Sequence, residues 1–181
     1  MKFFFKILLA TVLCSLIFSG CEEKIKPSVT STKLSGNPPS QESWNSRINF
    51  TQSGKLVAIV TAGHLTVYDD RKQTHLDEKI KVDFYDEAGK QTTELTAEQG
   101  IVNDLTRDLE AIGNVIVISD EGTTLRTEQL SWTNSTQKIH TDAYVEIDSP
   151  KEKIRGHGLE SDQHLKNYKI LKVTGQSAKI E

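Results

Sequence analysis

The chain has 181 residues, a net charge of −3 and 36% hydrophobic residues, which predicts one domain, or one domain with a tail. Without Lys2 and Lys6 of the apolar N-terminal segment, 20 basic and 25 acidic residues remain, a net charge of −5. This balance argues against a basic nucleic-acid-binding protein. No cysteine follows Cys21, so the sequence excludes a domain held together by disulfides.

Residues 1–20 differ from the rest of the chain. They contain fourteen hydrophobic residues, no acidic residue and four of the six phenylalanines. Two lysines precede the apolar run Ile7–Phe18, which is shorter than the roughly 20 residues that a membrane-spanning helix needs. We therefore predict a signal peptide of the lipoprotein type over residues 1–20.

The end of this segment resembles a bacterial lipobox. The stretch Phe18–Cys21 has two small residues before the cysteine, although Phe18 stands where the pattern prefers leucine. The resemblance implies that Cys21 receives lipid and becomes the new N-terminus. Two acyl chains would anchor the protein without a transmembrane helix. An uncleaved N-terminal helix over Phe3–Gly20 is the alternative.

The next segment, residues 21–46, is rich in Pro, Ser, Thr and Asn and has no apolar periodicity. We predict that it is a lipidated N-terminus followed by a flexible tether. A folded domain is predicted over residues 47–181. Trp44, near the end of the tether, is expected to dock against the edge of this domain.

From about Phe50 onward, apolar and polar residues alternate as they do in β-strands. The segments Leu109–Val117 and Ile139–Ile147 have a period of two and lie thirty residues apart. The preceding pieces, Leu95–Gln99 and Leu125–Gln129, repeat at the same interval. Helical spacing is missing from this region, so the sequence predicts an all-β fold built from repeated antiparallel hairpins.

Each repeat also carries the signs of a bend and of tight turns. Leu95 and Ala97 have odd numbers whereas Val102 is even, and the sister strand shifts its apolar parity at the same place. Such a shift indicates a β-bulge. The segments Asp86–Gly89 and Ser119–Gly122 end in glycine, as hairpin turns with a left-handed residue do. The pattern predicts stacked, bent hairpins that bury one shared inner face.

The predicted inner face carries mainly small and β-branched side chains. Two interpretations are open: a dry core in which two sheets approach closely, or a slot that accepts an apolar ligand. The candidate groove residues are Val60, Ala62, Val82, Phe84, Leu95, Ala97, Leu109, Ala111, Val115, Val117, Leu125, Trp132, Ile139, Val145 and Ile147.

Five fragments follow one another in order over roughly residues 50–175, behind the N-terminal anchor and the tether. They are Val82–Asp86 before a glycine turn, Leu95–Glu98, Gly113–Val115, Leu125–Glu128 with Leu130 and Trp132, and Ile154–Leu159. Their order and spacing resemble the LptC family, the membrane-anchored periplasmic component of the lipopolysaccharide export system. The soluble bridge protein LptA shares the repeat, and the N-terminal anchor distinguishes the two.

The resemblance implies a twisted, open β-jellyroll whose apolar interior holds the acyl chains of lipopolysaccharide. It implies that the protein receives this lipid from an inner-membrane ABC transporter of the LptB2FG type and passes it to an LptA-type periplasmic bridge protein. The transporter would face Phe50–Val67, and the bridge would face the strand near Tyr168–Gly175. It also implies a location on the periplasmic side of the inner membrane. A β-repeat lipoprotein acting as a structural adaptor, or a soluble LptA-like bridge component, is the alternative.

No arrangement of residues in the sequence is typical of catalysis or of metal binding. The acid pairs Asp69–Asp70 and Asp86–Glu87 offer too few oxygens for calcium, and neither a phosphate-binding loop nor a nucleophile elbow is present. We therefore expect a protein without enzymatic activity or cofactor. The histidines lack the spacing of metal ligands and are expected at exposed or turn positions: His64, His75, His140, His157 and His164.

Overall fold

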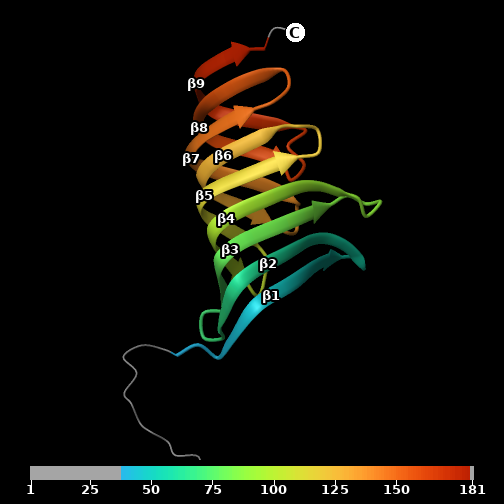
Figure 1. Cartoon of the computed structure of the whole chain (residues 1–181), viewed down its shortest axis with the longest axis vertical. Coiled ribbons are helices and arrows are strands. Elements are labelled where there is room, and N and C mark those ends of the chain that lie inside the picture. The colour runs from blue at the N-terminus through green and yellow to red at the C-terminus, as the bar shows by residue number, and fades with distance from the viewer. Residues whose placement is uncertain (1–37, 180–181) are drawn as a thin grey trace, which may run out of the picture. The chain divides into compact units, whose positions relative to one another are not determined.

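The computed structural model describes residues 38–179, which form nine β-strands and no helix. Each strand pairs antiparallel with the next, so that one sheet runs in chain order from β1 to β9 (Figure 1). The predicted all-β fold with an open sheet is confirmed. The strands are β1 (Gln41–Gln52), β2 (Lys55–Tyr68), β3 (Gln73–Tyr85), β4 (Gln91–Asn103), β5 (Leu109–Ser119), β6 (Thr124–Thr133), β7 (Lys138–Asp148), β8 (Glu152–Asp162) and β9 (Tyr168–Ala178).

The strands bend near their middles, where the pairing slips. All six ladders from β2–β3 to β7–β8 have such an interruption. The slips after Thr96 in β4 and after Thr127 in β6 confirm the bulges predicted from the shift in parity. At the bend of β3, Glu78 and Lys79 have φ values of 61° and 60°. Because a bulge bends a strand while its side chains stay on one face, the sheet folds into two facing layers.

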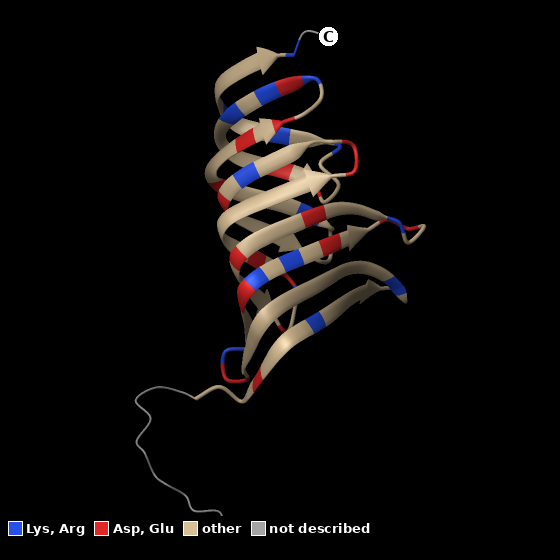
Figure 2. Cartoon of the chain, in the orientation of Figure 1, with Lys and Arg blue, Asp and Glu red and all other residues tan. Residues whose placement is uncertain are grey.

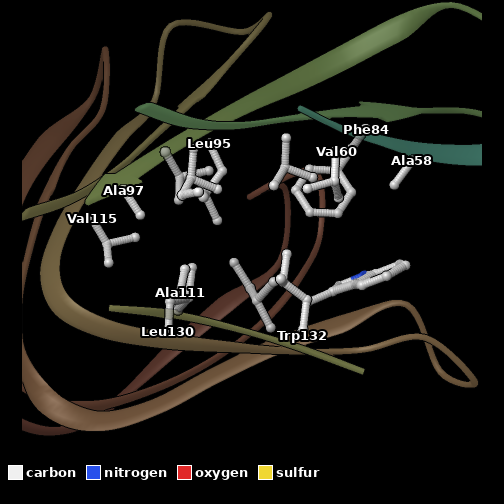
Figure 3. Packing of buried hydrophobic residues seen from close by; sticks show 14 of the residues in the cluster. Ala58, Val60, Phe84, Leu95, Ala97, Ala111, Val115, Leu130 and Trp132 are labelled. Atoms are coloured by element: carbon white, nitrogen blue, oxygen red, sulfur yellow. The ribbon is translucent and has the colours of Figure 1, made fainter. Parts of the chain in front are cut away.

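The two layers enclose one hydrophobic cluster. Figure 3 shows Ala58, Val60 and Phe84 on one side of this cluster and Trp132 on the other. The Trp132 ring meets Phe50 and Phe84 edge-on, with ring centroids 5.6 and 5.4 Å apart. Such aromatic pairs add about 0.5–1.5 kcal/mol to the stabilisation from burial alone. Aromatic side chains from β1, β3 and β6 therefore hold the two layers together.

The turns have the chemistry that the sequence predicts. Gly89 and Gly122 have φ values of 79° and 84°. The N–H of Gly89 donates to the carbonyl of Asp86, and that of Gly122 to the carbonyl of Ser119, both at 3.0 Å. The side chain of Asp86 also accepts hydrogen bonds from backbone N–H groups within its turn. Glycine in the left-handed region closes these hairpins without steric cost.

The two outer strands, β1 and β9, each pair on one side. β1 starts at Gln41, before residue 47, and includes Trp44, which is 63% exposed and stacks on His64 at 5.2 Å. β9 is exposed along most of its length, including Val173, which is 54% exposed. Acidic and basic residues are interspersed along the strands and turns (Figure 2).

Candidate functional site

All fifteen predicted groove residues lie in the hydrophobic cluster between the layers. Each is between 0% and 8% exposed. The alternation of the strands therefore brings them to one inner face, as the period of two predicts. Contact between these side chains and a lipid remains a prediction.

Other members of the cluster extend it toward both ends of the sheet. Phe50 and Leu76 bury their side chains near the start of the domain, and Leu159 does so in β8. These positions follow the same alternation and are recognisable from it. Leu165 is different, because it lies in the turn between β8 and β9, where no periodicity signals burial.

Two hollows among the described residues lie near the turns. A hollow of about 400 Å³ is lined by residues such as Gln52, Tyr85 and His164. A second, of about 990 Å³, surrounds the β8–β9 turn and includes Lys138 and Tyr168 in its lining. Neither is lined by any predicted groove residue. The interior side chains pack into one hydrophobic cluster, within which the Trp132 ring contacts Phe50 and Phe84.

The antiparallel order of the strands places alternate turns at opposite ends of the sheet, in two rows. The first row contains the turns at residues 53–54, 86–90, 120–123 and 149–151, and the second contains those at residues 69–72, 104–108, 134–137 and 163–167. We call the line along which the two rows touch the seam. On the opposite side the strands bend from one layer into the other, so the backbone joins the layers there.

The turn of residues 163–167, which we call the β8–β9 loop, covers the seam. The carboxylate of Asp162 accepts hydrogen bonds from the backbone N–H groups of His164, Lys166 and Asn167 at 2.9–3.1 Å, and from the Asn167 side chain at 2.9 Å. Burial alone would raise the pKa of Asp162, but these hydrogen bonds outweigh it and hold the pKa below its ordinary value. The loop is therefore organised around one charged carboxylate.

Two side chains of this loop point into the core. Leu165 is 2% exposed and adopts a φ of 56°. Gln163 is 1% exposed, and its Oε1 accepts a hydrogen bond from Trp132 Nε1 at 3.0 Å. The backbone N–H of Gln163 donates to the carbonyl of Gln137 at 3.2 Å. The loop is thus tied to the largest side chain of the interior.

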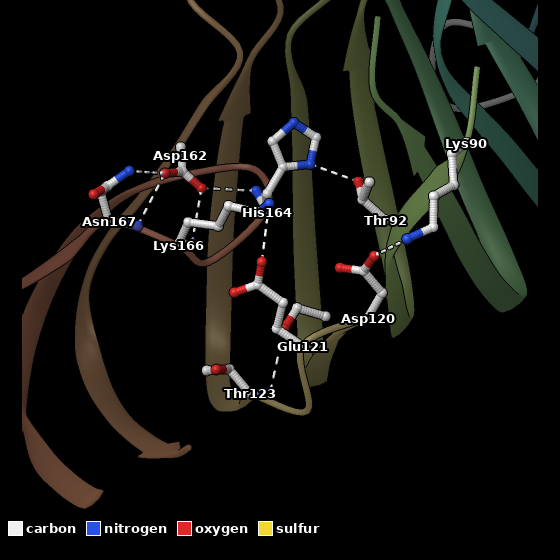
Figure 4. Close-up of polar contacts among 10 residues, drawn as sticks. Lys90, Thr92, Asp120, Glu121, Thr123, Asp162, His164, Lys166 and Asn167 are labelled. Carbon is white, nitrogen blue, oxygen red and sulfur yellow. Dashed lines mark hydrogen bonds and ion pairs between the residues drawn. The ribbon is translucent and has the colours of Figure 1, made fainter. Parts of the chain in front are cut away.

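Three pairs of polar side chains cross the seam. Thr92 Oγ1 lies 2.5 Å from His164 Nδ1, and Lys166 Nζ lies 2.9 Å from Glu121 Oε1 (Figure 4). The hydrogen bond to Glu121 raises the pKa of Lys166. In the third pair, which joins residues 52 and 137, the Gln137 amide donates to the Gln52 amide at 2.7 Å. Sequence reasoning missed these contacts, since their partners are far apart in the chain.

The sequence model of one protein family, described as "Lipopolysaccharide-assembly, LptC-related", matches residues 7–178. The match covers nearly all of the described residues and much of the N-terminal segment. The chain belongs to the LptC family. Comparison of the sequence with curated proteins returns no match. Membership of the LptC family gives the chain a role in lipopolysaccharide transport, as part of the Lpt system on the periplasmic side of the inner membrane.

Cys21 and the predicted signal peptide lie outside the described residues, and within residues 38–179 no helix is long and apolar enough to cross a membrane. Over the same range, no group of His, Cys, Asp or Glu side chains could hold a metal ion. As expected, His140 and His157 are exposed and His164 lies in the β8–β9 loop, whereas His64 and His75 are half-buried within β2 and β3.

Proposed function

We propose that this LptC-family protein binds the acyl chains of lipopolysaccharide between its two layers. It receives the lipid from an inner-membrane ABC transporter of the LptB2FG type and passes it to an LptA-type periplasmic bridge protein. The observation that supports this proposal is the single apolar cluster, which extends from Phe50 in β1 to Leu159 in β8. An acyl chain would find apolar contacts along the whole length of the sheet.

Burial of the lipid supplies the driving force. Each methylene group that leaves water gains about 0.8 kcal/mol. Because the core is packed in this conformation, the layers must separate before a chain can lie between them. The separation exposes apolar surface that the acyl chains then cover again. The bound lipid thus replaces contacts such as those of Trp132 with Phe50 and Phe84.

The two outer strands are the proposed docking edges for the neighbouring domains. β1 and β9 each present an unpaired edge, to which a strand of another protein can add by backbone hydrogen bonds. We assign the β1 edge to the transporter and the β9 edge to the bridge. Exposed Val173 and half-buried Ile170 in β9 would then be covered by the bridge protein, so that the apolar interior continues into it.

The proposed anchor is lipid attached to Cys21 after removal of residues 1–20. Replacing Cys21 by Ala should abolish labelling of the protein with radioactive palmitate. An uncleaved N-terminal helix would instead leave the mass of the whole chain intact and the labelling absent in both proteins.

Native mass spectrometry of the protein extracted from its own membrane tests whether it carries lipid. Bound lipopolysaccharide is the expected result. Protein that is consistently free of lipopolysaccharide would favour a structural adaptor, which uses the edges of β1 and β9 over a permanently dry core.

A further inference from the structure

We propose that the seam is a lateral gate for the acyl chains and that the β8–β9 loop is its latch. The inference rests on the proposed function, because it concerns the route by which the lipid reaches the packed interior. Two routes are open to an acyl chain: along the axis of the sheet from an outer edge, or sideways between the two rows of turns. The contacts at the seam favour the second route.

The polar contacts at the seam join turns of opposite rows, in addition to the apolar contacts between the two layers. Glu121 lies just before β6, and Lys166 lies just after β8. The end of β8 lies beside the end of β6, because Lys138 in β7 pairs with the last residues of both strands. The two side chains are therefore at opposite ends of a strand that would span roughly 30 Å if it were straight. Their separation of 2.9 Å exists only while the bent layers are closed.

Backbone hydrogen bonds between turns join turns of the same row, whereas the bonds that cross the seam are made by side chains. The Asp120 N–H donates to the Thr92 carbonyl within the first row, and the Gln163 N–H donates to the Gln137 carbonyl within the second. The other backbone hydrogen bonds between turns of residues 38–179 also stay within one row. Across the seam, the polar bonds involve side chains. The two rows can therefore part without breaking any strand ladder.

The bonds across the seam are suited to reversible opening. The side chains of Lys166 and Glu121 are 49% and 60% exposed, so that water and salt weaken their attraction. Leu165 holds a backbone conformation that is unfavourable for leucine. An acyl chain is a saturated hydrocarbon, as the Leu165 side chain is, and can take its place against the core. Movement of the loop thus exposes the interior at the point where the lipid would enter.

Chemical linkage across the seam tests this route. In the full-length chain, Glu121→Cys with Lys166→Cys places two thiols on opposite rows, and a short bismaleimide joins them after folding. The matched control, Lys90→Cys with Asp120→Cys, joins two turns of the same row whose side chains lie 2.6 Å apart. Chains with single new cysteines account for reaction at Cys14 and Cys21. A photoreactive amino acid at Val115 then reports capture of purified lipopolysaccharide.

We expect the link across the seam to lower capture at least tenfold, and the link within the first row to leave it within twofold of the unlinked chain. Equal capture by both linked proteins would overturn the lateral gate and show that the lipid enters from an outer edge. An equal loss in both would overturn it too, because the effect would not depend on the seam. Failure of the unlinked chain to capture lipid would instead refute the proposed function.

The latch has a separate kinetic test. Replacing both Glu121 and Lys166 by Ala should speed the capture of lipopolysaccharide at Val115 severalfold. The same change at Lys90 and Asp120 should leave the rate unchanged. An unchanged or slower rate for the pair at the seam would overturn the role of the β8–β9 loop as a latch.

Discussion

The hydrogen bond between Trp132 and Gln163 joins the β8–β9 loop to the core, and its strength can be measured. Trp132→Phe keeps an aromatic ring between the layers but removes the Nε1 donor. Gln163→Met keeps a side chain of similar length but removes the Oε1 acceptor. The double variant removes both partners at once. The three proteins form a double-mutant cycle with the wild type.

The burial of both residues sets the expected magnitude. Because Gln163 is 1% exposed, Trp132→Phe leaves its amide oxygen without a donor from Trp132 and out of water. An unsatisfied buried polar group costs about 1–3 kcal/mol. The smaller ring adds about 1 kcal/mol through lost burial. Gln163→Met similarly leaves the buried indole N–H of Trp132 without its acceptor, whereas the double variant contains neither the donor nor the acceptor. We expect the double variant to lose about 1–2 kcal/mol less than the sum of the two single variants.

Urea unfolding of the full-length proteins in mild detergent, followed by far-ultraviolet circular dichroism, gives the four free energies of unfolding. Substitutions at non-interacting sites add to within about 0.5 kcal/mol. Additivity within that limit would therefore refute the claim that this bond ties the loop to the core. A coupling of the expected sign would support it.

Two further predictions concern the C-terminal strands. Gly156→Ala should lower the free energy of unfolding by about 1–3 kcal/mol and speed hydrogen exchange of the β9 amides, because the new Cβ would lie 2.4 Å from the Lys172 carbonyl oxygen. Gly175→Ala is the control, since a Cβ there would have nothing within 4 Å. Equal effects of the two substitutions would contradict this steric explanation. Hydrogen bonds from Lys153 and Lys179 lower the pKa of Asp148 to about 2. This carboxylate therefore stabilises the fold above its ordinary pKa of 3.8, and the contribution is lost as the pH falls toward 2. Asp148→Asn should flatten the loss of stability measured by thermal unfolding between pH 4 and pH 2, and an unchanged pH dependence would contradict the assignment.

The strands and their inner faces were predictable because alternation is a local signal. In Leu109–Val117 every second residue faces the interior or the bend, as the period of two predicts. The bulges were predictable for the same reason, since the shift in parity between Ala97 and Val102 is visible within one strand. Glycine turns such as Asp86–Gly89 need only their own residues.

The closure of the seam was not predictable in this way. His164 meets Thr92 from 72 positions away, and Gln137 meets Gln52 from 85 positions away. Such contacts depend on the summed angles of several bends, and no pattern within one strand specifies those angles. The burial of Leu165 has the same origin. The bend of β3 also lacks the usual signal, because Glu78 and Lys79 take positive φ values without glycine.

The central claim is that lipopolysaccharide lies between the layers, and site-specific photo-crosslinking in the membrane tests it most directly. Val115 and Val145 are buried on the inner face, whereas their neighbours Asn114 and Glu146 face outward, so that each pair differs by one position along a strand. With the photoreactive amino acid, Val115 and Val145 should capture lipopolysaccharide and the two neighbouring positions should not. Capture at Asn114 and Glu146 alone would contradict the account.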